Sequence, residues 1–153
     1  MIQFVYGQDV AISTLVAKLV SGSEANSYGR CKTIGVVDNK GRFLGGVVLY
    51  HYDPDSGSIQ MTAAGLNPSG LSRRTINRIG DFVFGECGCQ ILRVDVREDN
   101  TRVLEILAGI GFTFTRVTRL GGRKLDGVIC TLTDDDWYAS KLSHGRPIKE
   151  EAA

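Results

Sequence analysis

The sequence predicts an α/β (α+β) protein in which helices flank one mixed, mainly antiparallel central sheet. Segments with the apolar spacing of helices alternate with strand-like segments in the order α-β-β-β-α-β-α-β-β. Turn signals such as residues 38–41 (DNKG) join consecutive strands as hairpins, which makes most of the sheet antiparallel. Around residues 59–96 and 91–120 a helix separates two strands, so crossover connections are expected there.

The N-terminal half is expected to contain one helix and three strands. Residues 8–20 have apolar side chains at helical spacing, and Asp9 is placed to cap the start of this helix. The strand-like segments are KTIGVVD at 32–38, RFLGGVVLYHY at 42–52 and SIQMTAAGL at 58–66, and turn-rich segments separate them.

The C-terminal half alternates between helical and strand-like segments. Residues 72–86 repeat apolar side chains at helical spacing after the N-cap Ser72, and a second helix follows the N-cap Asn100. Strands are expected at 91–97, 112–120 and 124–132, with Gly121-Gly122 as the turn between the last two, and one or two helical turns at 134–141.

The composition is that of one globular domain. The 153 residues suit a single domain over 1–140 followed by a flexible tail over 141–153. The formal net charge of +1 gives no global attraction to nucleic acid or to a membrane surface. No apolar run of about 18 residues predicts a membrane span. Residues 1–13 lack the pattern of a secretory signal, so a cytoplasmic protein is expected.

The four cysteines are expected to be small residues in or near the core. Cys87 and Cys89 form a C-x-C pair, whereas zinc sites typically use C-x-x-C together with a second pair. The sequence therefore predicts no metal site.

Residues 68–75 (PSGLSRRT) have the composition of an anion site. They end at a helix N-terminus, where unpaired backbone N–H groups and the helix dipole favour negative charge. Gly70 permits close approach of the backbone, Ser72 adds a hydroxyl, and Arg73 and Arg74 add guanidinium groups suited to phosphate. The same residues also fit a solvent-facing helix start with two solubilising arginines.

Residues 100–112 (NTRVLEILAGIGF) place Asn100 at a helix start and Gly111-Phe112 at the next strand, eleven and twelve residues later. This spacing, the hairpin that follows it and the element order over roughly residues 1–137 resemble the GNAT N-acetyltransferases. The variant common in phage and prophage genomes is the most similar, in GVVLYHY, NPSGLSRRTINRIGDFVF and CQILRVDV. Two positions depart from the family. The phosphate loop has a single glycine, Gly70, and Leu107 stands where the family often has a tyrosine that protonates the leaving thiolate.

The resemblance implies a three-layer GNAT-like fold whose central strands splay apart to hold acetyl-CoA. The pantetheine arm carries amides that can pair with the strand at 58–66 as an added strand would, and the pyrophosphate would lie on residues 70–75. The implied cofactor-binding residues are Met61, Thr62, Ala63, Gly70, Leu71, Ser72, Arg73, Arg74, Thr75 and Asn100. The residues alone leave other roles open. Ala63 also fits a central strand that makes room for a helix, and Asn100 is first of all an N-cap.

Amine acetylation needs a group that takes a proton from the acceptor and one that protonates or stabilises the thiolate. Asp95, on the polar side of ILRVDVR, and His51, in LYHY, are the candidate bases, and Tyr52 is a candidate acid or cleft wall. Each has an ordinary alternative. Asp95 can pair with Arg93 or Arg97, His51 can be an exposed strand-end residue, and Tyr52 can be a rim aromatic.

The function predicted from these observations is an acyltransferase that moves an acetyl group from acetyl-CoA to a small-molecule or protein amine by direct attack. One alternative is a module that binds acyl-CoA or a partner without turnover, which Leu107 and the reduced loop favour. Another is a phage-borne modifier of nucleic acid or of a host protein, with a basic edge formed by Arg73, Arg74, Arg78, Arg116, Arg119, Arg123 and Lys124. Edge strands in this architecture also make a homodimer a candidate assembly.

Overall fold

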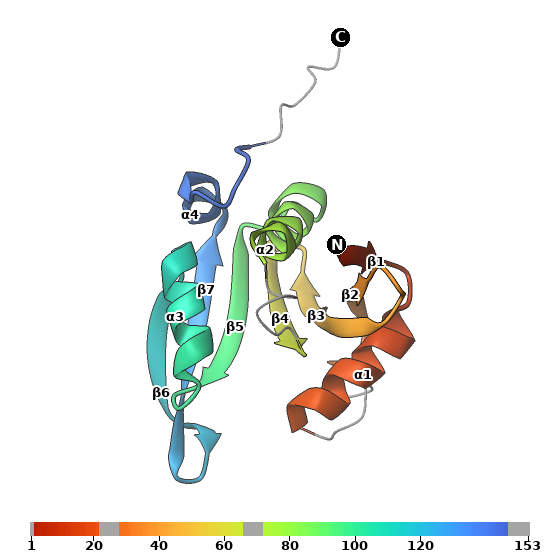
Figure 1. Ribbon diagram of the computed structural model, residues 1–153. Helices are drawn as coiled ribbons and strands as arrows, with labels where there is room; N and C mark the ends of the chain where they lie inside the picture. Colours follow the sequence, from red (N-terminus) through yellow and green to blue (C-terminus); the bar gives the residue numbers. More distant parts are fainter. Residues whose placement is uncertain (1, 22–27, 66–71, 147–153) are drawn as a thin grey trace.

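The computed structural model describes residues 2–21, 28–65 and 72–146. Over these residues the chain forms one sheet with helices on both faces (Figure 1). The strands are β1 (Ile2–Val5), β2 (Cys31–Asp38), β3 (Phe43–Asp53), β4 (Ser58–Ala64), β5 (Ile91–Arg97), β6 (Thr113–Gly122) and β7 (Leu125–Thr133). The helices are α1 (Asp9–Ser21), α2 (Arg73–Gly80), the π-helical segment η2 (Asp81–Glu86), α3 (Thr101–Ile110) and α4 (Asp134–Ala139).

The strand order in the sheet is β1-β2-β3-β4-β5-β7-β6. Only the β4–β5 pair is parallel among the strand pairs of the described residues, so the predicted mixed, mainly antiparallel sheet is confirmed. The parallel pair is joined through α2 and η2, which confirms the first crossover. In the second crossover, α3 connects β5 to the edge strand β6, and β7 then returns to lie between β5 and β6.

Two elements differ from the sequence prediction. The chain begins with β1, whose four residues are too few to show a strand period, so the element order starts with a strand and not with a helix. The helix expected over 72–86 is α-helical only to Gly80 and continues as a π-helix to Glu86. Apolar spacing does not distinguish these two kinds of helical turn over so short a stretch.

The faces of the sheet follow from the alternation of β3. Val47 and Leu49 belong to the core beneath α2 and α3, whereas Val48 packs with Ile12 and Val16 of α1 on the other face. A pair of glycines, Gly35 and Gly46, lets α1 approach closely. A Cβ atom on Gly35 would lie 2.7 Å from Ile12 Cδ1, and one on Gly46 would lie 2.9 Å from Ile12 Cγ2. The described helices and strands thus form three layers, in which α1 lies on one side of the sheet and α2 and α3 lie on the other.

The helix starts are only partly as the sequence predicts. Ser72 accepts a hydrogen bond from Thr75 N–H, and Asn100 accepts one from Val103 N–H, so both predicted N-caps are confirmed. Asp9 is the first residue of α1, and its Oδ1 accepts from the N–H and the hydroxyl of Thr33 on β2, each at 2.9 Å. The prediction that Asp9 caps α1 was therefore wrong, because its carboxylate ties the helix to the sheet.

The end of α3 explains the Gly-Phe pair. Gly111 has a φ of 117°, a backbone conformation that glycine adopts without strain, and Phe112 N–H closes the helix on Leu107 O at 3.1 Å. This turn sends the chain into β6. Among the described residues, none of the helices has the length and apolar character needed to span a bilayer.

Candidate active site

The parallel strands β4 and β5 separate part-way along their length. Their ladder runs from Ser58↔Ile91 to Met61↔Val94 and stops there. Both strands continue, because β4 stays paired with β3 as far as Ala64 and β5 stays paired with β7 as far as Arg97. We call the two facing edges, Thr62–Ala64 and Asp95–Arg97, the split. The predicted splaying of the central strands is thus confirmed, and it leaves unpaired backbone edges within the sheet.

A cleft of about 510 Å³ occupies the split. On one face of the sheet its walls are apolar side chains of α2 and α3, such as Ile76 and Val103. Leu19 and Val20 of α1 also line it, although α1 covers the opposite face. The lining of the cleft is therefore supplied by elements on both faces of the sheet. Its size lies within the range of small-molecule sites, about 300–1,000 Å³.

Five of the predicted cofactor-binding and catalytic residues line this cleft. They are Met61, Thr62, Ala63, Asp95 and Asn100. Leu107, which replaces the family's tyrosine, lines it as well and is 6% exposed. The cleft wall is therefore apolar at this point, and an acid would have to come from another element.

The predicted anion site is described in part, because Gly70 and Leu71 lie outside the described residues. Ser72 Oγ is occupied by Thr75, whose N–H it accepts at 3.2 Å and whose hydroxyl also lies at 3.2 Å. Arg74 donates to Ile2 O at 2.8 Å, and its guanidinium lies 5.2 Å from the ring centre of Phe4. Arg74 is thus engaged with β1, whereas Arg73 is an exposed side chain at the first position of α2.

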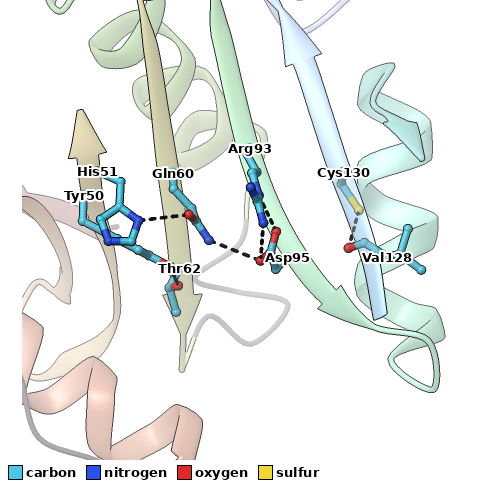
Figure 2. A network of polar contacts seen from close by, with 8 residues as sticks. All are labelled: Tyr50, His51, Gln60, Thr62, Arg93, Asp95, Val128 and Cys130. Carbon is cyan, nitrogen blue, oxygen red and sulfur yellow. Dashed lines mark hydrogen bonds and ion pairs between the residues drawn. The ribbon is translucent and has the colours of Figure 1, made fainter. Parts of the chain in front are cut away.

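A network of polar side chains crosses three strands on the face opposite α2 and α3 (Figure 2). Asp95 accepts from Arg93 Nε at 2.8 Å and from Arg93 Nη2 at 3.1 Å. Gln60 Nε2 lies 3.4 Å from Asp95 Oδ2, and Gln60 Oε1 lies 3.2 Å from His51 Nδ1. The ordinary alternative for Asp95, pairing with Arg93, is therefore present, and the pair belongs to a longer chain of contacts.

A second contact on this face joins β3 to the split. The hydroxyl groups of Tyr50 and Thr62 lie 2.9 Å apart, and Thr62 is the first residue of β4 beyond the parallel ladder. Thr62 also lines the cleft. A pair of hydroxyls at this position can donate a proton toward a group bound in the cleft.

His51 and Tyr52 lie in a bulge near the end of β3. The β3–β4 register shifts between Tyr50↔Gln60 and Asp53↔Ser58, and His51 has a φ of 54°. The bulge interrupts the alternation of the strand, so the His51 ring lies beside Tyr50, with ring centres 4.7 Å apart. Tyr52 is 54% exposed and does not belong to the described lining of the cleft.

Sequence reasoning missed Tyr50 and Gln60, and it named Arg93 only as a possible partner of Asp95. Their positions on strands are predictable, and Tyr50↔Gln60 and Gln60↔Arg93 stand opposite one another in the ladders. Predicting these neighbours requires the register of three strands, and at the bulge two residues of β3 stand opposite one residue of β4. The only signal in the sequence is the presence of polar residues on strands that are otherwise central and apolar.

No family model matches the sequence, and no curated protein sequence matches it. Among solved structures, mutant forms of the spermidine/spermine N-acetyltransferase SpeG of Vibrio cholerae are similar, with a TM-score of 0.72, 13% identity and coverage of 90% of this chain and 97% of theirs. An Acinetobacter baylyi protein assigned as an acetyltransferase has a TM-score of 0.68 and 14% identity, with coverage of 87% and 93%. The chain has the GNAT fold. At these identities the GNAT likeness concerns the fold, and function has to be argued from the cleft.

Proposed function

We propose that the protein is an acyltransferase that moves an acetyl group from acetyl-CoA to an amine. The observation that carries the proposal is the cleft through the split, which joins the two faces of the sheet at the point where two central strands lose their pairing. A donor on one face and an acceptor on the other can meet there. The GNAT fold, shared with solved N-acetyltransferases, supports the same reaction class.

The described residues fit acetyl-CoA as the donor. The pantetheine arm has amide groups that can pair with the unpaired edge of β4 at Met61, Thr62 and Ala63, and the small side chain of Ala63 leaves room for it. The phosphates are assigned to the start of α2, which has the first N–H groups of the helix and the exposed side chain of Arg73, together with Gly70 and Leu71. Asn100 lies in the cleft wall and caps α3. When bound, acetyl-CoA supplies an activated acyl group.

The groups that handle protons are assigned to the face opposite α2 and α3. Asp95 and His51 are the candidate bases for the acceptor amine, and Tyr52 is a candidate acid from the sequence. The hydroxyl pair of Tyr50 and Thr62 is a stronger candidate for donating a proton to the leaving thiolate, because Thr62 lines the cleft and Tyr52 does not belong to its described lining. Direct attack by the amine needs no covalent nucleophile on the protein.

The acceptor is assigned by class only, as a small-molecule or protein amine. SpeG is named as a spermidine/spermine N-acetyltransferase, but the charged residues of the described cleft lining are one aspartate and one arginine, Asp95 and Arg97. Asp95 is paired with Arg93, and Arg97 is paired with Asp99. This balance gives no particular attraction to a polycation.

A second copy of the chain could pair with the edge strand β6, which would make a homodimer.

A binding module without turnover is the second candidate, and the apolar Leu107 at the tyrosine position favours it.

The structure gives little support to the hypothesis of a modifier of nucleic acid. Arg78, like Arg74, stacks on Phe4, and Arg116 is paired with Glu98 and Asp126. These arginines of the predicted basic edge are therefore partly neutralised or covered. Kinship with phage-borne members is an expectation that rests on sequence resemblance.

The testing experiment is thermal unfolding with and without acetyl-CoA, for the parent protein and for Ala63→Phe. At about a hundred times its dissociation constant, a ligand adds about 2.7 kcal/mol to the free energy of unfolding. A hundredfold weaker affinity would leave about 0.4 kcal/mol at the same concentration. Ala63 is exposed in the cleft, so a phenylalanine there fills the donor site without entering the core.

Thr115→Phe is the matched control, because Thr115 is also an exposed strand residue and lies on β6, away from the cleft lining that the structure describes. We expect the parent and Thr115→Phe to be stabilised by acetyl-CoA and Ala63→Phe to lose the effect. Equal stabilisation of all three proteins would show that acetyl-CoA binds away from Ala63. Stabilisation of the parent without turnover of any amine in a broad screen would favour the binding module.

A further inference from the structure

The polar network in Figure 2 has a fixed direction of donation that ends at the Asp95 carboxylate. The Arg93 guanidinium donates twice to this carboxylate, and the same hydrogen bonds raise the pKa of Arg93. Both oxygens of Asp95 are therefore acceptors in a two-point contact with a guanidinium. An ionised carboxylate can only accept hydrogen bonds, so the group of Gln60 that faces Asp95 must be its NH2 group.

The orientation of Gln60 then determines the protonation of His51. With its NH2 group on Asp95, Gln60 presents its amide oxygen to His51 Nδ1 at 3.2 Å. An amide oxygen can only accept, so Nδ1 must carry a hydrogen. In a neutral imidazole the other nitrogen, Nε2, is then the one with a free lone pair.

We propose that Gln60 is a positioning residue that fixes the Nδ1–H tautomer of His51 and thereby makes Nε2 the base that takes the proton from the acceptor amine. The inference rests on the proposed acyl transfer and assigns a base for that reaction. The ring is held from a second side by the edge contact with Tyr50, and the bulge with its φ of 54° at His51 brings it onto this face.

His51 lies near the closed end of the split. Gln60 is the residue immediately before Met61, which forms the last pair of the β4–β5 ladder. Gln60 and Thr62 are two residues apart on β4 and therefore lie on the same face, so the Gln60–His51 pair lies beside the cleft, although neither residue belongs to its described lining. A proton from the acceptor therefore reaches Nε2 of His51 through bridging water.

Asp95 is less suited to be the base, although it lines the cleft. Its two oxygens accept three N–H donors, two from Arg93 and one from Gln60, so most of its acceptor positions are already occupied. Nε2 of His51 makes no comparable contact among the described residues. Asp95 thus orients Gln60, and Gln60 orients His51.

The proton balance of the step is complete. His51 Nε2 takes a proton from the ammonium form of the acceptor, and the freed lone pair of the amine nitrogen forms the new C–N bond with the acyl carbon. The C–S bond breaks and its electron pair goes to sulfur, which takes a proton from the Tyr50–Thr62 hydroxyl pair. The nitrogen loses a second proton on forming the amide, so two protons are given up in all. One of them replenishes the hydroxyl pair through solvent, and the other is released to solvent, which returns His51 to its neutral form.

The direct test reads the tautomer without any substrate. The chain has two histidines, so His144→Ala leaves His51 as the only ring in a ¹⁵N-detected histidine NMR spectrum. His144 is exposed and far along the chain. We expect the neutral His51 ring to be mainly the Nδ1–H form in this protein. Adding Gln60→Leu, which has a similar size but no amide, should remove that preference.

Gln3→Leu, on the exposed side of the short edge strand β1, is the matched control and should leave the tautomer unchanged. A parent ring that is mainly Nε2–H, or a tautomer that Gln60→Leu does not alter, overturns the positioning role. These outcomes do not depend on whether acetyl-CoA binds, so they are separate from a failure of the proposed function, which the thermal unfolding experiment detects.

The base role is tested by kinetics once an acceptor is known. His51→Ala should lower kcat by about 10²–10⁴-fold, the usual range for a general base, and added imidazole should restore part of the rate. Gln60→Leu should lower kcat about tenfold while KM for acetyl-CoA stays within twofold, because only orientation is lost. A His51→Ala enzyme with the parent's kcat, or one that imidazole does not rescue, overturns the assignment of His51 as the base.

Discussion

The hydroxyl groups of Tyr50 and Thr62 lie 2.9 Å apart at the first residue of β4 beyond its ladder with β5. Tyr50 is half-buried in a ring contact with Tyr28, and Thr62 lines the cleft, so the pair links the interior of the α1 side to the split. This relationship gives the cleft a hydroxyl donor in the absence of a tyrosine at position 107.

We expect Tyr50→Phe to lower kcat about tenfold and to change KM for acetyl-CoA little, because the hydroxyl acts on the leaving thiolate and not on binding. Thr62→Val should have a similar effect. The double variant should be no slower than the slower single variant, since the two hydroxyls act as one unit. Steady-state kinetics measures all three proteins. Tyr6→Phe, on an exposed side chain, is the control, and additive losses would show that the hydroxyls act separately.

The two arginines at the start of α2 are expected to differ in role. Arg74 donates to Ile2 O and stacks on Phe4, so Arg74→Ala should lower the free energy of unfolding by about 1 kcal/mol. Arg73 is exposed and makes no hydrogen bond to β1 in the part of the chain that the structure describes. Arg73→Ala should therefore weaken acetyl-CoA binding about tenfold, through the loss of one charge-assisted hydrogen bond.

Urea unfolding and calorimetric titration with acetyl-CoA separate these effects. The reverse pattern, in which Arg74→Ala binds poorly at unchanged stability, would restore the sequence-based assignment of Arg74 to the phosphates. Because Arg73 and Arg74 are neighbours of identical charge, each variant is the control for the other, and a nonspecific electrostatic effect would weaken binding equally in both.

Local patterns predicted most of the fold. The caps at Ser72 and Asn100 and the turn at Gly111 depend on contacts within a few residues, and such contacts are visible in the sequence. The alternation in residues 91–97 likewise gave the buried and exposed faces of β5. What failed were features decided by distant contacts, such as Asp9, whose carboxylate binds Thr33 across 24 positions in place of its own helix.

The candidate site was predictable only as a region. Asp95 was found as a polar residue of an alternating strand, Ala63 as a small residue in a strand, and Asn100 as the first residue of a helix, and all three line the cleft. The chain from Asp95 through Gln60 to His51 could not be found, because it requires the parallel register of β4 and β5 and a bulge that turns His51 toward Tyr50. A shift of one residue in the β4–β5 register or at the bulge would direct these side chains to the other face of the sheet.

The buried thiols should make the protein less stable at high pH. Burial raises the pKa of the Cys89 and Cys130 thiols to about 11, whereas an unfolded thiol titrates near 8.5. Above about pH 8.5 the unfolded chain therefore binds fewer protons than the folded one, so the free energy of unfolding falls as pH rises toward 11. At pH 10 each thiol should account for a loss on the order of 1 kcal/mol relative to pH 8.

Urea unfolding of the parent and of Cys130→Ala at pH 8 and pH 10 measures this loss. The variant should start less stable, because a buried side chain is shortened, but should lose less stability between the two pH values. Lysines and tyrosines titrate in the same range and cancel in the comparison. An identical pH dependence in both proteins would show that the Cys130 thiol is not protected in the folded state.

The contact between Gly80 and Trp137 should be the least tolerant in the helical layer. A Cβ atom on Gly80 would lie 2.0 Å from Trp137 Cζ2, and Trp137 is 1% exposed between α2 and the end of β7. Gly80→Ala should therefore lower the free energy of unfolding by at least about 1–3 kcal/mol, the cost of overpacking a core. Both residues line the cleft, so the same variant should also reduce stabilisation by acetyl-CoA.

Gly109→Ala is the control, because Gly109 is also helical and a Cβ there would meet nothing within 4 Å. This change should stabilise the protein by about 0.5–1 kcal/mol, since alanine loses less conformational freedom than glycine in a helix. Urea unfolding of the two alanine variants should thus give shifts of opposite sign. A Gly80→Ala protein as stable as Gly109→Ala would mean that Trp137 can move aside, and that the wall of the cleft between α2 and α4 is adjustable and not fixed by packing.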